Sequence, residues 1–279
     1  VNSLYPSMMS SESGNYYPLG KPKFFTKEIP DICLRNQLNK TPMYYFIRIK
    51  TRFKIKEGKL PFIQIKNTYK FRGNECLESS NVLIDGKYYT EYVDLDGTIN
   101  DGRVTLTMTM TDYQLFREHY DVFDFEILDG CYFVTQIGIF DSYINKYKQI
   151  KMNSKGAMRE LAKLFLNNLY GKMATSTNSS FKLVTPDEDG VLHYKTVYEN
   201  KKKPGYIAIG SAITSYARNF TIRAAQLNYH GVNRRGFIYA DTDSIHCDLN
   251  PNEIEGITVH DKNFCCWKLE SCWDKAIFV

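Results

Sequence analysis

The alternation of apolar and polar residues is clearest over 43–56, where it predicts a β-strand with two different faces. Ile47, Ile49 and Phe53 fall on one side, which we expect to be buried. The other side carries five cations, which repel one another unless something anionic faces them: Arg48, Lys50, Arg52, Lys54 and Lys56. This basic face is either a solvated surface or a track for a phosphate backbone, and the pattern leaves both interpretations open.

Turn residues and periodicity predict the other elements. Further β-structure is expected in five segments, with turns at Asp129-Gly130 and Asp187–Gly190: 61–71, 88–111, 122–139, 178–204 and 236–248. Helices are expected in four places: a short one after Pro6, one over 111–120 capped by Thr111 or Asp112, one over 155–173 and one over 211–229. Residues 12–40 are rich in turn residues. The sequence therefore predicts an α+β fold without internal repeats.

Composition narrows the class of protein. The 279 residues have a net charge of +5 and are 43% hydrophobic, and no apolar run reaches the length of about 18 residues that a transmembrane helix needs. A wholly disordered chain is excluded, and no membrane partner is expected. The seven cysteines are an odd number without secretory context, so we expect reduced thiols inside a cell and not a secreted protein. A zinc site is a weak alternative, because its candidate ligands lack a C-x2-C knuckle: His260, Cys265, Cys266 and Cys272.

Two acidic residues stand in the tight turn of 236–248. Asp241 and Asp243 are two positions apart, so both carboxylates can project to one side of an extended chain. Two ionised carboxylates held close together destabilise each other unless a cation bridges them or one is protonated. In proteins, Mg²⁺ is bound by one or two carboxylates together with substrate phosphates. The alternatives are a solvated turn and the similar Asp-x-Asp pair of metal-dependent glycosyltransferases.

The helix expected over 155–173 has two distinct faces. One is apolar and is expected to be buried: Leu161, Leu164, Phe165 and Leu169. Another repeats cations and an asparagine every four residues: Lys155, Arg159, Lys163 and Asn167. Tyr170 lies one turn beyond this row, Lys151 would extend it backwards, and Glu160 falls off it. Like charges at this spacing destabilise a helix by about 0.2–0.5 kcal/mol per pair, so the row indicates a face that meets a polyanion such as a triphosphate, whereas a solvated face would carry mixed signs.

A third feature is the segment Ser3-Leu4-Tyr5-Pro6, whose helix start has free N–H groups for an anion, although an ordinary capped helix explains it as well. The three features follow one another as Ser3-Leu4-Tyr5-Pro6, Lys163-x3-Asn167-x2-Tyr170-Gly171 and Tyr239-x-Asp241-Thr242-Asp243-Ser244. Together they resemble motifs A, B and C of family B DNA polymerases. The insertions between them are similar to those of the protein-primed branch, which is organellar and viral and occurs in small phages, adenoviruses and linear plasmids.

The resemblance implies template-directed DNA synthesis, in which a nucleotide passes from a dNTP to a primer 3′-hydroxyl or to a hydroxyl of a terminal protein. It implies two Mg²⁺ ions, for which Mn²⁺ is a substitute, held by Asp241, Asp243 and the backbone carbonyl of Val1. The implied partners are primer–template DNA, dNTPs and a terminal protein primer. The implied compartment is a host cytoplasm, or a mitochondrion for a plasmid-borne element.

The resemblance also assigns binding residues. Those for the nucleotide are Ser3, Leu4, Tyr5, Lys151, Arg159, Lys163, Asn167 and Tyr170. Those for DNA are Gly171, Lys172, Thr214, Arg218 and Tyr239. Tyr5 would exclude a 2′-hydroxyl by packing under the deoxyribose, and Gly171 would let the template approach the backbone closely.

The same resemblance implies a division of the chain. It gives a palm of antiparallel sheet and packed helices, helical fingers and two terminal-protein-type insertions: palm 1–11 and 207–279, first insertion 12–138, fingers 139–174, second insertion 175–206. The Asp of motif A would precede Val1, and the exonuclease and thumb would lie outside the sequence, so these residues are expected to be inactive alone. The alternative is a non-catalytic remnant of a decayed element that binds nucleic acid or terminal protein.

Overall fold

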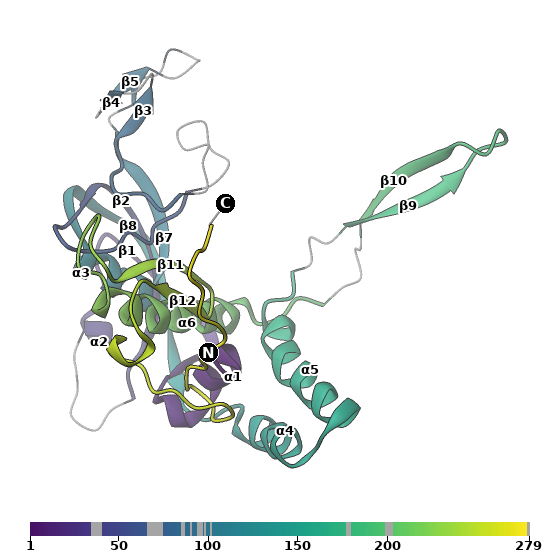
Figure 1. The fold of residues 1–279 in the computed structure, drawn as a ribbon. Coiled ribbons are helices and arrows are strands. Elements are labelled where there is room, and N and C mark those ends of the chain that lie inside the picture. The colour runs from purple at the N-terminus through teal and green to yellow at the C-terminus, as the bar shows by residue number, and fades with distance from the viewer. Residues whose placement is uncertain are drawn as a thin grey trace.

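The largest sheet has four antiparallel strands in the order β1-β8-β2-β7 (Figure 1). Its strands are β1 (Tyr17–Thr26), β2 (Tyr44–Ile55), β7 (Val104–Thr109) and β8 (Tyr120–Gln136). The computed structural model describes residues 1–34, 41–65, 75–84, 87–89, 91–93, 97, 99–100, 102–176, 180–198 and 203–277. The antiparallel sheet and its packed helices confirm the predicted α+β class.

The long strand β8 corrects the predicted turn at Asp129-Gly130. The strand continues through that position without a turn. Glycine is needed there because neighbouring strands approach closely: a Cβ would lie 2.3 Å from both the Phe25 ring and the Phe46 carbonyl oxygen. The β2–β8 register shifts twice, and Asp124 has a φ of 49°. Such bulges bend a strand and increase its twist, which curls the sheet.

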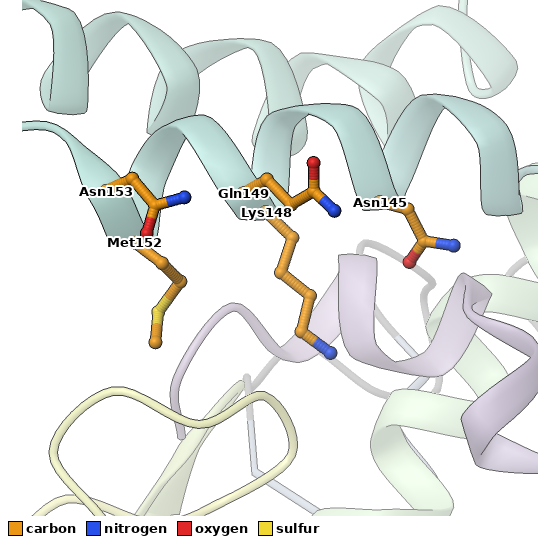
Figure 2. Close-up of a pocket in the computed structure, with 5 residues that line it drawn as sticks. All are labelled: Asn145, Lys148, Gln149, Met152 and Asn153. Atoms are coloured by element: carbon orange, nitrogen blue, oxygen red, sulfur yellow. The ribbon is translucent and has the colours of Figure 1, made fainter.

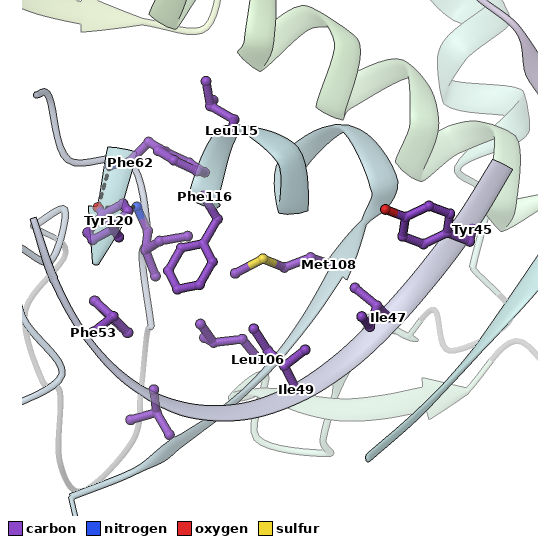
Figure 3. Close-up of a cluster of buried hydrophobic side chains, with 12 residues drawn as sticks. Tyr45, Ile47, Ile49, Phe53, Phe62, Leu106, Met108, Leu115, Phe116 and Tyr120 are labelled. Carbon is purple, nitrogen blue, oxygen red and sulfur yellow. Dashed lines mark hydrogen bonds between the residues drawn. The ribbon is translucent and has the colours of Figure 1, made fainter. Parts of the chain in front are cut away.

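The two faces of β2 are as predicted. Ile47, Ile49 and Phe53 are buried in a cluster with helix α3, shown in Figure 3. On the opposite face Arg48 pairs with Asp129 and Arg52 with Asp124, both on β8. Two of the five cations thus have anionic partners within the sheet, which favours the solvated interpretation over a phosphate track.

The helices are α1 (Leu4–Met9), α2 (Asp31–Leu34), α3 (Met110–His119), α4 (Asp141–Asn153), α5 (Gly156–Met173) and α6 (Ile207–Leu227), with short 3₁₀ turns η1 (Ser11–Ser13) and η2 (Pro251–Glu253). Helices α1, α3, α5 and α6 were predicted; α4 and strand β1 were not. The cap of α3 is Thr109, whose Oγ1 accepts the Asp112 N–H at 3.1 Å, and not Thr111 or Asp112. Among the described helices, none has both the length and the apolar character for a membrane crossing.

The remaining strands form two-stranded pieces. They are β3 (Val82–Ile84) with β4 (Lys87–Tyr89), β5 (Tyr92–Val93) with β6 (Ile99–Asn100), β9 (Ser180–Pro186) with β10 (Leu192–Tyr198), and β11 (Phe237–Asp241) with β12 (Ser244–Cys247). The last two pairs confirm the predicted hairpins, and β9–β10 projects from the body in Figure 1. The strand expected over 61–71 is wrong for 61–65, which is irregular, and its remainder lies outside the described residues.

A second apolar cluster joins the elements that carry motifs A and B to helices α4 and α6. It contains Met9 of α1, Ile144 of α4, Leu166 of α5 and Ile213 of α6. Helix α5 buries Ala162 and Leu166. Of the four residues predicted to form its apolar face, Leu169 packs against the cluster. The prediction is wrong for the remaining three, which are 38–54% exposed: Leu161, Leu164 and Phe165. Packing between α4 and α6 selects a stripe rotated from the one that the sequence suggested.

Candidate active site

The Asp-Thr-Asp turn between β11 and β12 is held in place from two sides. Asp241 pairs with Ser244 across the hairpin, which leaves Thr242 and Asp243 as the two turn residues. Thr242 has a φ of 42°, a strained conformation for a β-branched residue. Its carbonyl oxygen accepts a hydrogen bond of 2.9 Å from Oγ1 of Thr221 on α6, and its own Oγ1 donates to Oδ1 of Asp241 at 3.0 Å. The helix and the turn together fix the Asp241 carboxylate.

The start of the chain lies against this turn. The Val1 nitrogen donates to the carbonyl oxygen of Asp243 at 2.6 Å, so residues 242 apart in sequence are adjacent. The Asn2 backbone N–H donates to the Cys266 carbonyl oxygen at 3.0 Å. Ser3 has a φ of 53°, and α1 begins directly after it. The motif A and motif C segments therefore meet in space, as the resemblance implies.

Tyr5 joins these two segments to motif B. Its ring centroid is 4.5 Å from that of Tyr170 on α5. Burial raises the pKa of Tyr5, Tyr170 raises it further, and Asp243 and Asp241 act in the same direction, whereas Arg218 opposes them. These electrostatic effects place the Tyr5 hydroxyl among both carboxylates and one cation, so the phenol remains protonated at neutral pH.

Three predicted phosphate ligands face one another across α4 and α5. Burial lowers the pKa of Lys151, and Arg159 and Lys163 lower it further. The Lys151 Nζ donates to Ser3 Oγ at 2.8 Å, which connects this group of cations to α1. We call Lys151, Arg159 and Lys163 the cation group.

Two details of the predicted row are wrong. Lys155 is the N-cap residue with extended backbone, so it precedes α5 and does not continue the helical row. Glu160 does reach the row, because its carboxylate lies 4.0 Å from Arg159 and 3.9 Å from Lys163. Exposed pairs of this length stabilise little, so Glu160 tempers the repulsion without removing it.

The end of α5 is open on its outer side. Asn167, Gly171 and Lys172 are exposed, while Tyr170 is half-buried. A Cβ built on Gly171 would meet no described atom within 4 Å, and its φ is not positive. Nothing in the described chain therefore explains a glycine at this position.

The predicted DNA-contacting residues on α6 and β11 differ in the partners that their side chains have within the protein. The Thr214 hydroxyl donates to the Ser211 carbonyl oxygen of its own helix at 3.0 Å. Arg218 donates from Nη1 to Oδ2 of Asp112 on α3 at 2.5 Å. The Tyr239 ring is 42% exposed, with its centroid 5.5 Å from that of His246 on the paired strand.

The donor chemistry of the turn suits Mg²⁺. Two exposed carboxylates at Asp241 and Asp243 provide hard oxygen ligands, and phosphates and water complete such sites. No group of three or more His, Cys, Asp or Glu that could hold a metal occurs in the described part of the chain. The zinc alternative gains no support, since His260 Nδ1 accepts the N–H groups of Lys262 and Asn263.

The pocket in Figure 2 does not coincide with the predicted site residues. It is lined by one side of α4 only: Asn145, Lys148, Gln149, Met152 and Asn153. Lys148 points from it toward the N-terminal segment, where its Nζ lies 3.0 Å from the Glu12 carboxylate. None of the predicted site residues lines it, so we assign the site to the motifs and not to the pocket.

Comparison with known proteins decides the family. Residues 1–111 and 105–258 match the family described as DNA polymerase type B, organellar and viral. The chain belongs to this family. The DNA polymerase of Bacillus phage phi29 is 35% identical over 285 residues, covering 100% of this chain and 43% of the relative. That of Streptococcus phage Cp-1 is 34% identical over 263 residues, covering 91% of this chain and 41% of the relative.

The fold agrees with a solved polymerase of the family. The chain superimposes on phi29 DNA polymerase complexed with primer–template DNA and incoming nucleotide substrates, with a TM-score of 0.74 at 35% identity. The match covers 96% of this chain and 41% of that chain. The chain therefore spans less than half the length of these type B polymerases.

The predicted membership in the protein-primed type B branch is confirmed. Sequence reasoning missed two residues beside the site, Thr221 and Asp112. Both act through hydrogen bonds between elements far apart in sequence, so no local pattern marks them. The sequence offered one signal, the charged residue Asp112 at the start of a helix. We interpreted Asp112 as a candidate helix cap and not as a partner of another helix.

Proposed function

We propose that the full-length gene product containing this sequence is a DNA-directed DNA polymerase that adds dNTPs to a primer 3′-hydroxyl or to a terminal-protein hydroxyl. One observation carries the proposal. The ring centroids of Tyr5 and Tyr170 are 4.5 Å apart and Val1 donates to the Asp243 carbonyl oxygen at 2.6 Å, which supports one site built from motifs A, B and C. Phage or linear-plasmid replication is the setting that the family supports.

Asp241, Asp243 and the Val1 carbonyl would hold the metal, as two Mg²⁺ ions or Mn²⁺ in their place. When bound, these ions supply charge neutralisation and activation of the primer hydroxyl. The chain's own contribution is orientation, because Thr221 and Thr242 fix the Asp241 carboxylate before substrate arrives.

The cation group would grip the triphosphate, together with the backbone amides of Ser3, Leu4 and Tyr5. Lys151 is already held against Ser3, so it needs little ordering on binding. Glu160 would leave Arg159 and Lys163 when the more highly charged triphosphate arrives. Nucleotide affinity should therefore depend on replacement of the Glu160 carboxylate by the triphosphate.

Base-pair and sugar selection would come from the aromatic pair. Tyr5 would lie under the deoxyribose and exclude a 2′-hydroxyl. Tyr170 and Asn167 would form the wall against which the new base pair is tested. The contact between Tyr5 and Tyr170 would couple selection of the sugar to selection of the base pair, because a shift of one ring changes the packing of the other.

DNA would follow the exposed end of α5 and the face of α6. The open space at Gly171 supports close approach of a template backbone, with Lys172 as its neighbouring cation. Thr214, Arg218 and Tyr239 would contact the primer–template. The engaged hydroxyl of Thr214 leaves its methyl group and helix backbone as the surface for DNA.

A terminal protein would bind the predicted insertions, 12–138 and 175–206, which interrupt palm 1–11 and 207–279 and fingers 139–174. The β9–β10 hairpin supports this proposal, because an isolated two-stranded hairpin is marginally stable in water. Several apolar side chains on it are exposed, including Phe181, Leu192 and Tyr194 at 54–64%. All seven cysteines are free thiols, which fits a reducing host compartment.

The test is primer extension by the full-length gene product. Asp243→Asn should lower single-nucleotide incorporation by at least about a thousandfold, because a metal ligand loses its charge. Asp248→Asn is the matched control, since Asp248 follows β12 and lies 3.8 Å from Arg235 on the surface. Near-normal incorporation by Asp243→Asn would exclude the proposal, and a wild type that binds DNA without incorporation would favour the non-catalytic remnant.

A further inference from the structure

Helices α3 and α6 share a buried polar contact near the site that ordinary packing does not explain. Oδ2 of Asp112 accepts from Ser215 Oγ at 2.8 Å and from Arg218 Nη1 at 2.5 Å. Ser215 in turn accepts from Thr109 Oγ1 at 2.8 Å. The four residues form one hydrogen-bonded chain from the start of α3 to the middle of α6.

The contact is costly for stability. The Asp112 side chain is only 14% exposed, and its Oδ1 is buried without a hydrogen-bond partner in the described structure. An unpaired buried acceptor on a charged group is destabilising, and apolar residues of similar volume would pack there at no such cost. A purely structural role is therefore a poor account of Asp112.

Arg218 has the opposite character. Its side chain is 42% exposed, and its neighbour Ala217 packs in one cluster with Leu4 and Tyr5, so this part of α6 lies beside the candidate site. An arginine has five N–H donors, and Asp112 engages it through Nη1. Asp112 thus holds the guanidinium through one donor, and the half-exposed side chain keeps further donors available to a ligand.

We propose that Asp112 is a positioning residue for the primer–template: it anchors the Arg218 guanidinium so that its remaining donors meet a backbone phosphate. The inference rests on the proposed function. Prior fixation of Arg218 reduces the side-chain entropy lost on DNA binding, and a fixed fork matches phosphate geometry. Asp112 lies in the segment assigned to the first insertion, so that segment would serve DNA binding as well as a terminal protein.

The chain offers a matched control on the same two helices. Glu118 of α3 lies 2.9 Å from Arg223 of α6, one helical turn or more beyond Arg218. Both side chains are about half exposed, and neither residue is among the predicted site residues. Glu118→Gln therefore breaks an α3–α6 ion pair without altering Arg218.

The experiment measures binding of a fluorescent primer–template to the full-length gene product at several salt concentrations. Asp112→Asn should weaken binding about tenfold and reduce the slope of log Kd against log salt by about one, as expected for one lost phosphate contact. Arg218→Ala should do the same, and Asp112→Asn added to Arg218→Ala should cause no further loss. Glu118→Gln should leave both quantities unchanged.

Binding by Asp112→Asn that equals or exceeds that of wild type would overturn the inference, since Asp112 would then merely neutralise Arg218. An equal loss in Glu118→Gln would overturn it too. If Asp112→Asn does not fold, Ser215→Ala removes a second donor from the same oxygen and should weaken binding about twofold to threefold; no change there also refutes it. DNA binding without nucleotide incorporation in wild type would refute the proposed function alone.

Discussion

Replacing Gly171 with alanine separates the stability of α5 from its proposed use. A glycine inside a helix is destabilising by about 0.5–1 kcal/mol relative to alanine. The added Cβ would meet no described atom within 4 Å, and the backbone there is not left-handed, so no clash or strain opposes this gain. Because Gly171 lies two residues before the end of α5 at Met173, we expect the free energy of unfolding to rise by about 0.5 kcal/mol.

The same methyl group should harm DNA binding. If a template backbone packs directly on Gly171, a Cβ separates the two surfaces and removes at least one phosphate contact. A loss of about 1.4 kcal/mol corresponds to tenfold weaker binding. Gly171→Ala should therefore give a more stable protein with about tenfold weaker primer–template affinity, a combination that general damage to the fold does not produce.

Thermal or urea unfolding and fluorescence anisotropy with labelled primer–template measure the two effects on one preparation. Asn168→Ala is the control for helix propensity, because Asn168 is exposed on the same helix and this change leaves the glycine at 171 in place. Unchanged DNA affinity in Gly171→Ala would refute the close approach of the template. A fall in stability would refute the open space around the Cβ.

Two further predictions concern the nucleotide. Tyr5→Val should relax discrimination against ribonucleotides by at least about tenfold in kcat/KM, because the wall under the sugar shrinks; an unchanged ratio would remove Tyr5 from this role. Burial and two neighbouring cations lower the pKa of Lys151 below its usual 10.5. Lys151 therefore loses its proton at a lower pH than an exposed lysine, and the dNTP KM should rise as the proton is lost. Lys151→Arg keeps its charge and should flatten the KM profile at alkaline pH below 10.5, whereas an identical profile in both proteins would contradict the assignment.

The sequence predicted well what local patterns determine. The alternation in β2 marked its buried face, because each side chain's direction follows from the two-residue period of a strand. Three local patterns identified the motifs: the Ser3-Leu4-Tyr5-Pro6 segment, the spacing of Lys163, Asn167 and Tyr170, and the Asp-x-Asp turn. Their meeting in space came from the family resemblance and not from any one pattern.

Features set by tertiary contacts were not predictable. Strand β1 follows Gly14 and contains Gly20 and two prolines, so its local sequence resembles a loop, and pairing with β8 makes it a strand. The buried stripe of α5 depends on where α4 lies, and α4 was itself not expected. Glu160 reaches Lys163 because side-chain length, and not helical angle alone, decides which charges meet.

Helix α6 connects the Asp-Thr-Asp turn to the rest of the molecule. It holds Thr242 through Thr221, and its Gln226 donates to the Gly58 carbonyl oxygen at 2.8 Å beside the curled sheet. The strained turn thus has little stability of its own. It is stabilised by a helix that packs against both apolar clusters. Amide hydrogens of α6 should exchange with solvent only through global unfolding. Through Thr221, the turn that carries Asp241 and Asp243 is then attached to one of the last elements to open.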